Sequence, residues 1–145
     1  MISIGLDIST SCTGYCVLSE NGSLLDIGHI ILSKEKDQFC KAQKVLEHLS
    51  VLHSKYKFKN VYVEQNLQAF RPGFSSATTL FSLARFNGIV CYICERDINI
   101  KPETINVNVA RKTLGLKILK GTSYNTKDQV RNWVLNDILK NNKNG

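Results

Sequence analysis

Residues 2–8 read ISIGLDI, and this stretch is the most direct indication of the fold. Isoleucine or leucine stands at every even position, and Ser3, Gly5 and Asp7 stand between them. Alternation with a period of two is typical of a β-strand that has one apolar face. The stretch therefore predicts a strand that is buried on one face and carries Asp7 on the other.

Two more β-rich segments follow, TGYCVLS at residues 13–19 and SLLDIGHIIL at residues 23–32. Asn21 and Gly22 lie between them, and such a pair supplies the positive φ angles of a tight hairpin turn. We therefore expect the first three strands to form an antiparallel meander.

A helix and a fourth strand come next. Between residues 37 and 56 the apolar side chains recur at the spacing of an amphipathic helix, with lysines between them. The segment NVYVEQ at residues 60–65 alternates again, with Val61 and Val63 on its apolar face and Glu64 on the other. A strand that is reached from a hairpin through a helix is expected to lie parallel to its neighbour.

The remaining elements are more helical. Arg-Pro-Gly at residues 71–73 marks a loop, and apolar residues nearly encircle a second helix at residues 76–96, which predicts deep burial. Residues 98–107 favour a strand, and shorter helices are expected at residues 109–114 and 126–140.

This order of elements predicts an α/β fold. We expect a mixed sheet, with three antiparallel strands followed by parallel strands, flanked by helices. A chain of 145 residues has the size of one domain, so residues 1–145 are predicted to form a single domain.

The net charge of +7 is unevenly distributed. Residues 1–100 hold ten Lys or Arg against nine Asp or Glu, whereas residues 101–145 hold nine against three, so +6 of the charge lies in the last third. This excess predicts contact with a polyanion, although a solvated basic surface explains the charge as well.

The composition also bears on the compartment. The five cysteines fit no disulfide framework, and no apolar run approaches the roughly 18 residues of a membrane span. We therefore expect an intracellular, cytoplasmic protein. Cys91 and Cys94 form a CxxC pair without a second pair, which favours small core side chains over zinc or redox chemistry.

Asp7 and Glu64 are the residues that indicate chemistry. An ionised carboxylate on a buried strand is unfavourable unless protein dipoles or a cation compensate it. Two of them suggest a shared divalent cation, and Mg²⁺ or Mn²⁺ suits oxygen ligands of this kind. In the alternative interpretation the carboxylates are separately hydrogen-bonded, Asp7 to the backbone near Ser9 and Thr10.

Five motifs together resemble the RuvC-type Holliday junction resolvases and their viral relatives. They are GLDISTS at residues 5–11, TGY at 13–15, VEQ at 63–65, the stretch from SSA to ARFNG at 75–88, and TKDQV at 126–130. The resemblance covers essentially the whole chain. It implies a ribonuclease H-like fold, hydrolysis of branched DNA with two Mg²⁺ or Mn²⁺ ions, and phage or viral origin.

The resemblance also implies roles for single residues. Asp7 and Glu64 would be metal ligands on adjacent strands, and Lys127 would lie near the scissile phosphate, where a cation offsets developing charge. A phosphate-binding track is expected to include Arg111, Lys112, Lys117, Lys120 and Arg131.

The resolvases have a loop after the glutamate that probes the junction, often with an aromatic residue where this chain has Leu67. Phe70 or Phe74 is expected to stack on a base instead, and Arg71 to meet a phosphate. Folding of the aromatic side chains back onto the core is an equally good interpretation.

One feature of the resolvases does not match this chain. They carry further acidic ligands on a final helix beyond the lysine, and this sequence ends before such a segment, so we expect it to be C-terminally incomplete. Asp137 shares a helical face with Trp133 and Val134 and is the candidate substitute ligand. A surface aspartate at a helix end is the competing interpretation.

The sequence also leaves two other functions and a homodimeric state to be considered. Actin-like and sugar-kinase proteins share the fold and hold phosphate with a similar hairpin, but they enclose a nucleotide between two such domains. A non-catalytic nucleic-acid-binding member of the fold would keep Asp7 and Glu64 for structure. A nuclease that makes two paired cuts calls for a homodimer, for which Phe81 and Phe86 are interface candidates, unless they serve the core.

Overall fold

The computed structural model describes residues 1–65 and 76–140. The chain divides into two compact units, Met1–Ile105 and Asn106–Gly145. The assignment of residues 1–145 to a single domain stays a prediction.

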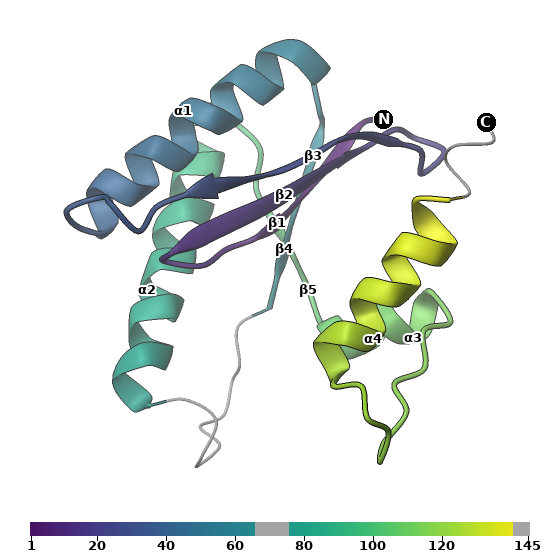
Figure 1. The fold of residues 1–145 in the computed structure, drawn as a ribbon. Coiled ribbons are helices and arrows are strands. Elements are labelled where there is room, and N and C mark those ends of the chain that lie inside the picture. The colour runs from purple at the N-terminus through teal and green to yellow at the C-terminus, as the bar shows by residue number, and fades with distance from the viewer. Residues whose placement is uncertain (66–75, 141–145) are drawn as a thin grey trace. The chain divides into compact units, whose positions relative to one another are not determined.

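The first unit is built on a five-stranded mixed sheet in the order β3-β2-β1-β4-β5 (Figure 1). The strands are β1 (Ser3–Asp7), β2 (Cys12–Leu18), β3 (Leu24–Ile31), β4 (Asn60–Glu64) and β5 (Glu103–Ile105). The first three pair antiparallel, whereas β4 pairs parallel with β1 and β5 pairs parallel with β4. The predicted mixed sheet is therefore confirmed.

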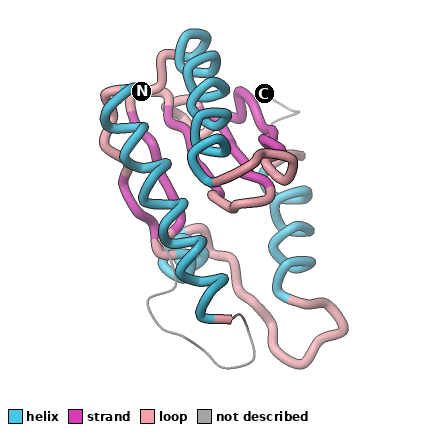
Figure 2. The backbone as a smooth tube through the Cα atoms, turned by 90° about the vertical axis from the view of Figure 1, so that its left-hand side faces the viewer, coloured by secondary structure: helices cyan, strands magenta, loops and turns pink. Residues whose placement is uncertain are grey.

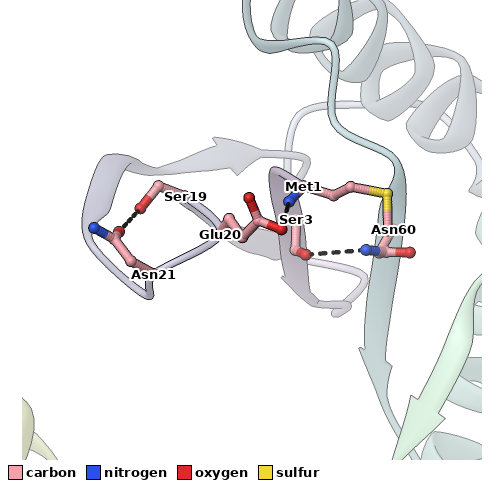
Figure 3. A network of polar contacts seen from close by, with 6 residues as sticks. All are labelled: Met1, Ser3, Ser19, Glu20, Asn21 and Asn60. Carbon is pink, nitrogen blue, oxygen red and sulfur yellow. Dashed lines mark hydrogen bonds and ion pairs between the residues drawn. The ribbon is translucent and has the colours of Figure 1, made fainter.

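The turn between β2 and β3 lies where Asn21-Gly22 predicts it. Gly22 has the positive φ of 82°, whereas Asn21 is not among the residues with positive φ. The Asn21 side chain instead hydrogen-bonds the Ser19 hydroxyl (Figure 3). The Ser23 N–H donates to the same hydroxyl at 3.0 Å. The sequence predicts positive φ angles at both Asn21 and Gly22, but only Gly22 has one. Side-chain hydrogen bonds from Asn21 and Ser19 stabilise the turn instead.

The start of the chain is tied to this end of the sheet. The N-terminal ammonium of Met1 lies 3.0 Å from a carboxylate oxygen of Glu20 (Figure 3). Nearby, the Asn60 amide donates to the Ser3 hydroxyl at 3.3 Å and joins the first residues of β4 and β1. These contacts lie at the opposite end of the two strands from Asp7 and Glu64.

Helix α1 (Gln38–Tyr56) follows the prediction closely. The Asp37 carboxylate caps its N-terminus by accepting a hydrogen bond from the Cys40 N–H at 2.8 Å, and this bond lowers the pKa of Asp37. The helix ends at Lys57, whose left-handed backbone (φ 52°) lets its N–H reach the His53 carbonyl. The cap and the C-terminal stop together explain the observed length.

Helix α2 (Ala77–Ile93) continues into a π-helical turn, η1 (Cys94–Ile98). The Ser76 hydroxyl caps it by accepting from the Thr79 N–H at 3.1 Å. The predicted deep burial on all sides is wrong, because Phe81 is 75% exposed. An apolar side chain on every face gives no indication of which face meets the core.

The core lies between one face of the sheet and the two long helices, which run side by side (Figure 2). It consists of alternate strand residues, one face of α1 and one face of α2: Ile4, Leu6, Ile8, Val17, Ile30, Leu32, Ala42, Val45, Leu49, Leu52, Phe58, Val61, Val63, Phe86, Val90 and Cys94. Because even-numbered β1 side chains point into this core, Asp7 is left at the exposed end of the strand.

Residues 77–98 form the one described helix that is long and apolar enough to cross a membrane by length and composition. A helix that packs in a core can meet the same criterion. Here Phe86, Val90 and Cys94 are buried in the core, whereas Phe81 and Tyr92 are exposed.

The second unit contains α3 (Val107–Thr113), α4 (Thr126–Trp133) and a π-helical turn, η2 (Val134–Ile138). The Gln129 amide holds the loop before α4: it accepts from the Leu119 N–H at 2.8 Å and donates to the Leu119 and Tyr124 carbonyls at 2.9 and 3.0 Å. None of the residues described from 106 to 140 is fully buried.

Candidate functional site

Asp7 and Glu64 end two neighbouring parallel strands. Leu6 of β1 lies opposite Val63 of β4, so the next residue on each strand is one of the two acids. Both side chains are exposed and both line one open pocket of about 170 Å³. The sheet register therefore brings together two carboxylates that are far apart in the sequence.

The rest of the pocket wall comes from the segments that follow the two strands and from α2. Ile8, Leu80 and Leu83 form its apolar part, and Gln65 and Asn87 add side-chain amides. No lysine or arginine lines the pocket in the part of the chain that the structure describes. The pocket thus combines negative charge with neutral hydrogen-bonding groups.

A hydrogen-bonded turn follows Asp7. The buried Thr13 hydroxyl accepts from the Ser9 N–H at 3.4 Å and donates to the Ser9 carbonyl at 3.2 Å. Among residues 1–65 and 76–140 no hydrogen bond joins Asp7 to this turn. The interpretation in which the backbone near Ser9 compensates Asp7 is therefore wrong, because Thr13 takes that place.

The donor chemistry of the pocket fits a divalent cation. Mg²⁺ in proteins is commonly held by one or two carboxylates, while waters and substrate phosphate oxygens complete its coordination. Asp7 and Glu64 supply two carboxylates side by side. In the described residues no group of three His, Cys, Asp or Glu is close enough to hold a metal.

The residues predicted for the phosphate track and for the scissile phosphate belong to the second unit. Lys127 lies in the first turn of α4 and is exposed. Arg111 is half-buried, and Lys112, Lys117, Lys120 and Arg131 are exposed. Asp137 lies in η2 and is exposed. The proposed roles of all these residues stay predictions.

The predicted junction-probing residues, Phe70, Arg71 and Phe74, lie outside the described residues. The two interface candidates differ: Phe86 is 0% exposed and belongs to the core, whereas Phe81 is 75% exposed. Core packing is therefore the correct interpretation for Phe86.

The CxxC pair is part of the core, as predicted. Cys94 is fully buried, and desolvation together with the neighbouring Cys91 raises the pKa of its thiol to about 12. Burial also raises the pKa of Cys91. Thiols that stay protonated are poor metal ligands and poor nucleophiles.

Sequence reasoning missed Asn87. This residue is 8% exposed, lines the pocket of Asp7 and Glu64, and stands in α2 between Phe86 and Gly88. The sequence feature that could have indicated it is the single side-chain amide of Asn87 in an otherwise apolar segment. Its meaning depends on the sheet, because nothing local indicates that α2 passes the ends of β1 and β4.

The protein is similar to solved structures of Holliday junction resolvases. Thermus thermophilus RuvC in complex with a Holliday junction substrate is 13% identical with a TM-score of 0.65, covering 79% of this chain and 72% of that one. A second Thermus thermophilus RuvC structure is 15% identical with a TM-score of 0.56, covering 89% of both chains. The yeast mitochondrial resolvase Ydc2 is 11% identical with a TM-score of 0.54, covering 91% of this chain and 60% of that one.

No family model and no curated protein matches the sequence. At these identities the structural similarity defines the fold, which is ribonuclease H-like with the mixed sheet of the RuvC resolvases. A phage or viral origin stays a prediction.

Proposed function

We propose that the protein is a divalent-metal-dependent endonuclease that hydrolyses phosphodiester bonds in branched DNA, with four-way junctions as substrates. The observation that carries this proposal is the parallel pairing of β1 with β4, which brings Asp7 and Glu64 into one pocket. The fold supports it, since the RuvC of Thermus thermophilus that shares this fold was solved with a Holliday junction substrate.

Asp7 and Glu64 would hold Mg²⁺ or Mn²⁺ through their carboxylate oxygens, with two ions in the working site. Two such cations supply an activated water and stabilise the leaving oxygen in phosphodiester hydrolysis. Ile8, Leu80 and Leu83 form the apolar part of the pocket wall beside the two carboxylates. Lys127 would offset the charge that develops on the phosphate.

The second unit supplies the charge for a DNA partner. Residues 106–145 hold eight Lys or Arg against two Asp. Exposed lysines neutralise phosphates without reading sequence, which suits recognition of a DNA shape. Arg111, Lys112, Lys117, Lys120 and Arg131 would form this phosphate track, while Phe70, Phe74 and Arg71 would contact the branch point. Because four-way DNA junctions arise inside cells, we also propose an intracellular location.

Resolution of a four-way junction needs two paired cuts, and a two-fold symmetric dimer presents two equivalent sites to such a substrate. Phe81 is exposed on α2, and Tyr92, which lies about three turns further along the same face, is 60% exposed. We therefore propose a homodimer. Sedimentation velocity of wild type and of Phe81→Ser tests it: a dimer weakened by the substitution supports the proposal, and a monomeric wild type contradicts it.

A gel assay tests the nuclease function directly. A labelled four-way junction, a duplex of equal length and single strands are incubated with the protein in Mg²⁺ and in EDTA. Paired nicks near the crossover in Mg²⁺ alone would support the proposal. Cleavage that persists in EDTA, or that is as fast on the duplex as on the four-way junction, would contradict it.

A second function is favoured by one observation: in the described residues, Asp7 and Glu64 do not belong to a group of three His, Cys, Asp or Glu side chains that could hold a metal. In this alternative the protein binds branched DNA without cutting it. Junction-selective binding with no cleavage in Mg²⁺ or Mn²⁺ is the outcome that favours this function.

A further inference from the structure

Asn87 is a polar residue in a place where packing alone calls for an apolar one. It is 8% exposed, and Thr13 is the other polar residue buried in the described part of the chain. Leu80, Leu83 and Asn87 recur at helical spacing on one face of α2, and all three line the pocket of Asp7 and Glu64. Burying an amide is unfavourable unless the amide finds hydrogen-bond partners.

The hydrogen-bond partner of the Asn87 amide in the described residues occupies its oxygen. The Cys91 thiol, one helical turn further on, donates to Oδ1 of Asn87 at 3.5 Å, and a thiol is a weak donor. Within the described residues this is the hydrogen bond that Asn87 makes. The two N–H donors of the amide are thus available for hydrogen bonds within the pocket, which is also lined by the carboxylates of Asp7 and Glu64.

We propose that Asn87 is a positioning residue of the metal site. When the cation binds, its NH₂ group would donate a hydrogen bond to a carboxylate oxygen of Asp7 or Glu64, so that the other oxygen of that carboxylate is turned toward the cation. This bond is not among those that Asn87 makes in the described residues. Carboxylates that bind metals are commonly held by such outer partners, and loss of the partner weakens metal binding about 10- to 100-fold. This inference rests on the proposed metal-dependent function and adds a residue from α2 to its site.

The competing role is packing of α2 against the sheet. A packing role predicts that leucine, which has the same side-chain branching and number of heavy atoms as asparagine and matches the neighbouring Leu80 and Leu83, serves equally well at position 87. A positioning role predicts that leucine keeps the fold and loses metal affinity. Substitution by leucine therefore separates the two roles.

The test measures Mn²⁺ binding by the loss of the free-ion signal in electron paramagnetic resonance, on wild type, Asn87→Leu and Asn87→Ala. Both variants are expected to bind Mn²⁺ about 10-fold more weakly. The metal-free unfolding temperature of Asn87→Leu is expected to stay close to that of wild type. Ser82→Ala is the matched control, because Ser82 is a half-buried polar residue of α2 that binds Gln38 and does not line the pocket.

The outcomes distinguish the inference from the function on which it rests. Mn²⁺ binding that is lost in Asp7→Asn but unchanged in both Asn87 variants would overturn the role of Asn87 and leave the metal site standing. An equal loss of affinity in Ser82→Ala would also overturn it, because the effect would then belong to α2 as a whole. No Mn²⁺ binding by wild type would overturn both the metal site and the inference.

Discussion

The Thr13 hydroxyl bridges both backbone polar groups of Ser9. It accepts from the Ser9 N–H at 3.4 Å and donates to the Ser9 carbonyl at 3.2 Å, and Thr13 itself is 0% exposed. One buried side chain therefore fixes the turn that begins directly after Asp7 and Ile8. The position of Asp7 depends on β1 on one side and on this turn on the other.

Thr13→Val keeps the shape of the side chain and removes both hydrogen bonds. It is expected to lower the free energy of unfolding by about 1–3 kcal/mol, because the Ser9 N–H and carbonyl lose their partner. It should also weaken Mn²⁺ binding, since the turn beside Asp7 loosens. Urea unfolding and Mn²⁺ titration measure the two effects. Thr13→Ser retains the hydroxyl, so a loss of Mn²⁺ affinity as large in Thr13→Ser would refute the link.

Asp7→Asn and Glu64→Gln each remove one negative charge from the pocket with little change in shape. Each is expected to lower Mg²⁺-dependent cleavage by at least about 100-fold, because loss of an outer partner alone has effects up to that size. Junction binding, followed by gel shift in EDTA, should stay largely intact. Glu47→Gln, an exposed acid of α1, is the control. Cleavage retained in both site variants would contradict the assignment.

The environment of His53 leads to a prediction of how the free energy of unfolding depends on pH. Its ring packs edge-on against Phe58 with 4.6 Å between ring centroids, and its Nδ1 is buried without a hydrogen-bond partner in the described residues. Desolvation, followed by the charges of Lys57 and Lys59, holds the pKa of His53 below its ordinary value of 6.5. The neutral ring is therefore the form that suits the folded protein.

As the pH falls below about 6.5, the unfolded chain takes up a proton at His53 before the folded chain does, so the free energy of unfolding decreases. The contribution is fully present above that pH and is lost toward the lower pKa of the folded state. Urea unfolding at several pH values between 7.5 and 5 measures it. His53→Leu should flatten this dependence, and His48→Gln, an exposed residue, should not. An unchanged slope in His53→Leu would rule out the assignment.

Gly28 lies directly opposite Tyr15 in the pairing of β2 with β3. A Cβ at Gly28 would lie 2.5 Å from the Tyr15 hydroxyl oxygen and 2.7 Å from its Cζ. Gly28→Ala is therefore expected to destabilise the fold by about 1–3 kcal/mol, because the ring must move. In a Tyr15→Ala background the same substitution should have a smaller effect in urea unfolding. Gly5→Ala is the control, since its Cβ meets nothing within 4 Å.

Lys117 and Lys120 predict the salt dependence of DNA binding. Each lysine that neutralises a phosphate contributes about 0.9 to the slope of log affinity against log salt. Lys117→Gln and Lys120→Gln should each lower this slope by about that amount and weaken junction and duplex alike. Fluorescence anisotropy between low and moderate salt measures the slope. A variant whose slope equals that of wild type makes no phosphate contact at that position.

Much of the fold was predictable because its signals are local. The alternation in residues 2–8 marks β1, and the apolar spacing before Tyr56 marks α1. Both are set by the period of the backbone, which each segment carries with it. The same reasoning failed for α2, where Phe81 and Tyr92 are exposed. An apolar residue shows that a face can be buried, but a partner surface is needed to bury it.

The candidate site was predictable in part for the same reason. Asp7 and Glu64 are recognisable because each is a charged residue at the end of an apolar strand. Asn87 was missed because an asparagine within a helix does not by itself indicate a functional site, whereas a charged residue on an apolar strand does. Its place beside the two acids became visible once the pocket residues were known.

The amino-acid sequence alone establishes the order of strands and helices, the basic last third and the two carboxylates that do not suit their strands. The tertiary structure alone establishes that Leu6 faces Val63, so that Asp7 and Glu64 meet, and that α2 brings Asn87 to the same pocket. The physical reason is that periodicity is a property of neighbours in the chain. Sheet order and register are set by packing between segments that are distant in the sequence.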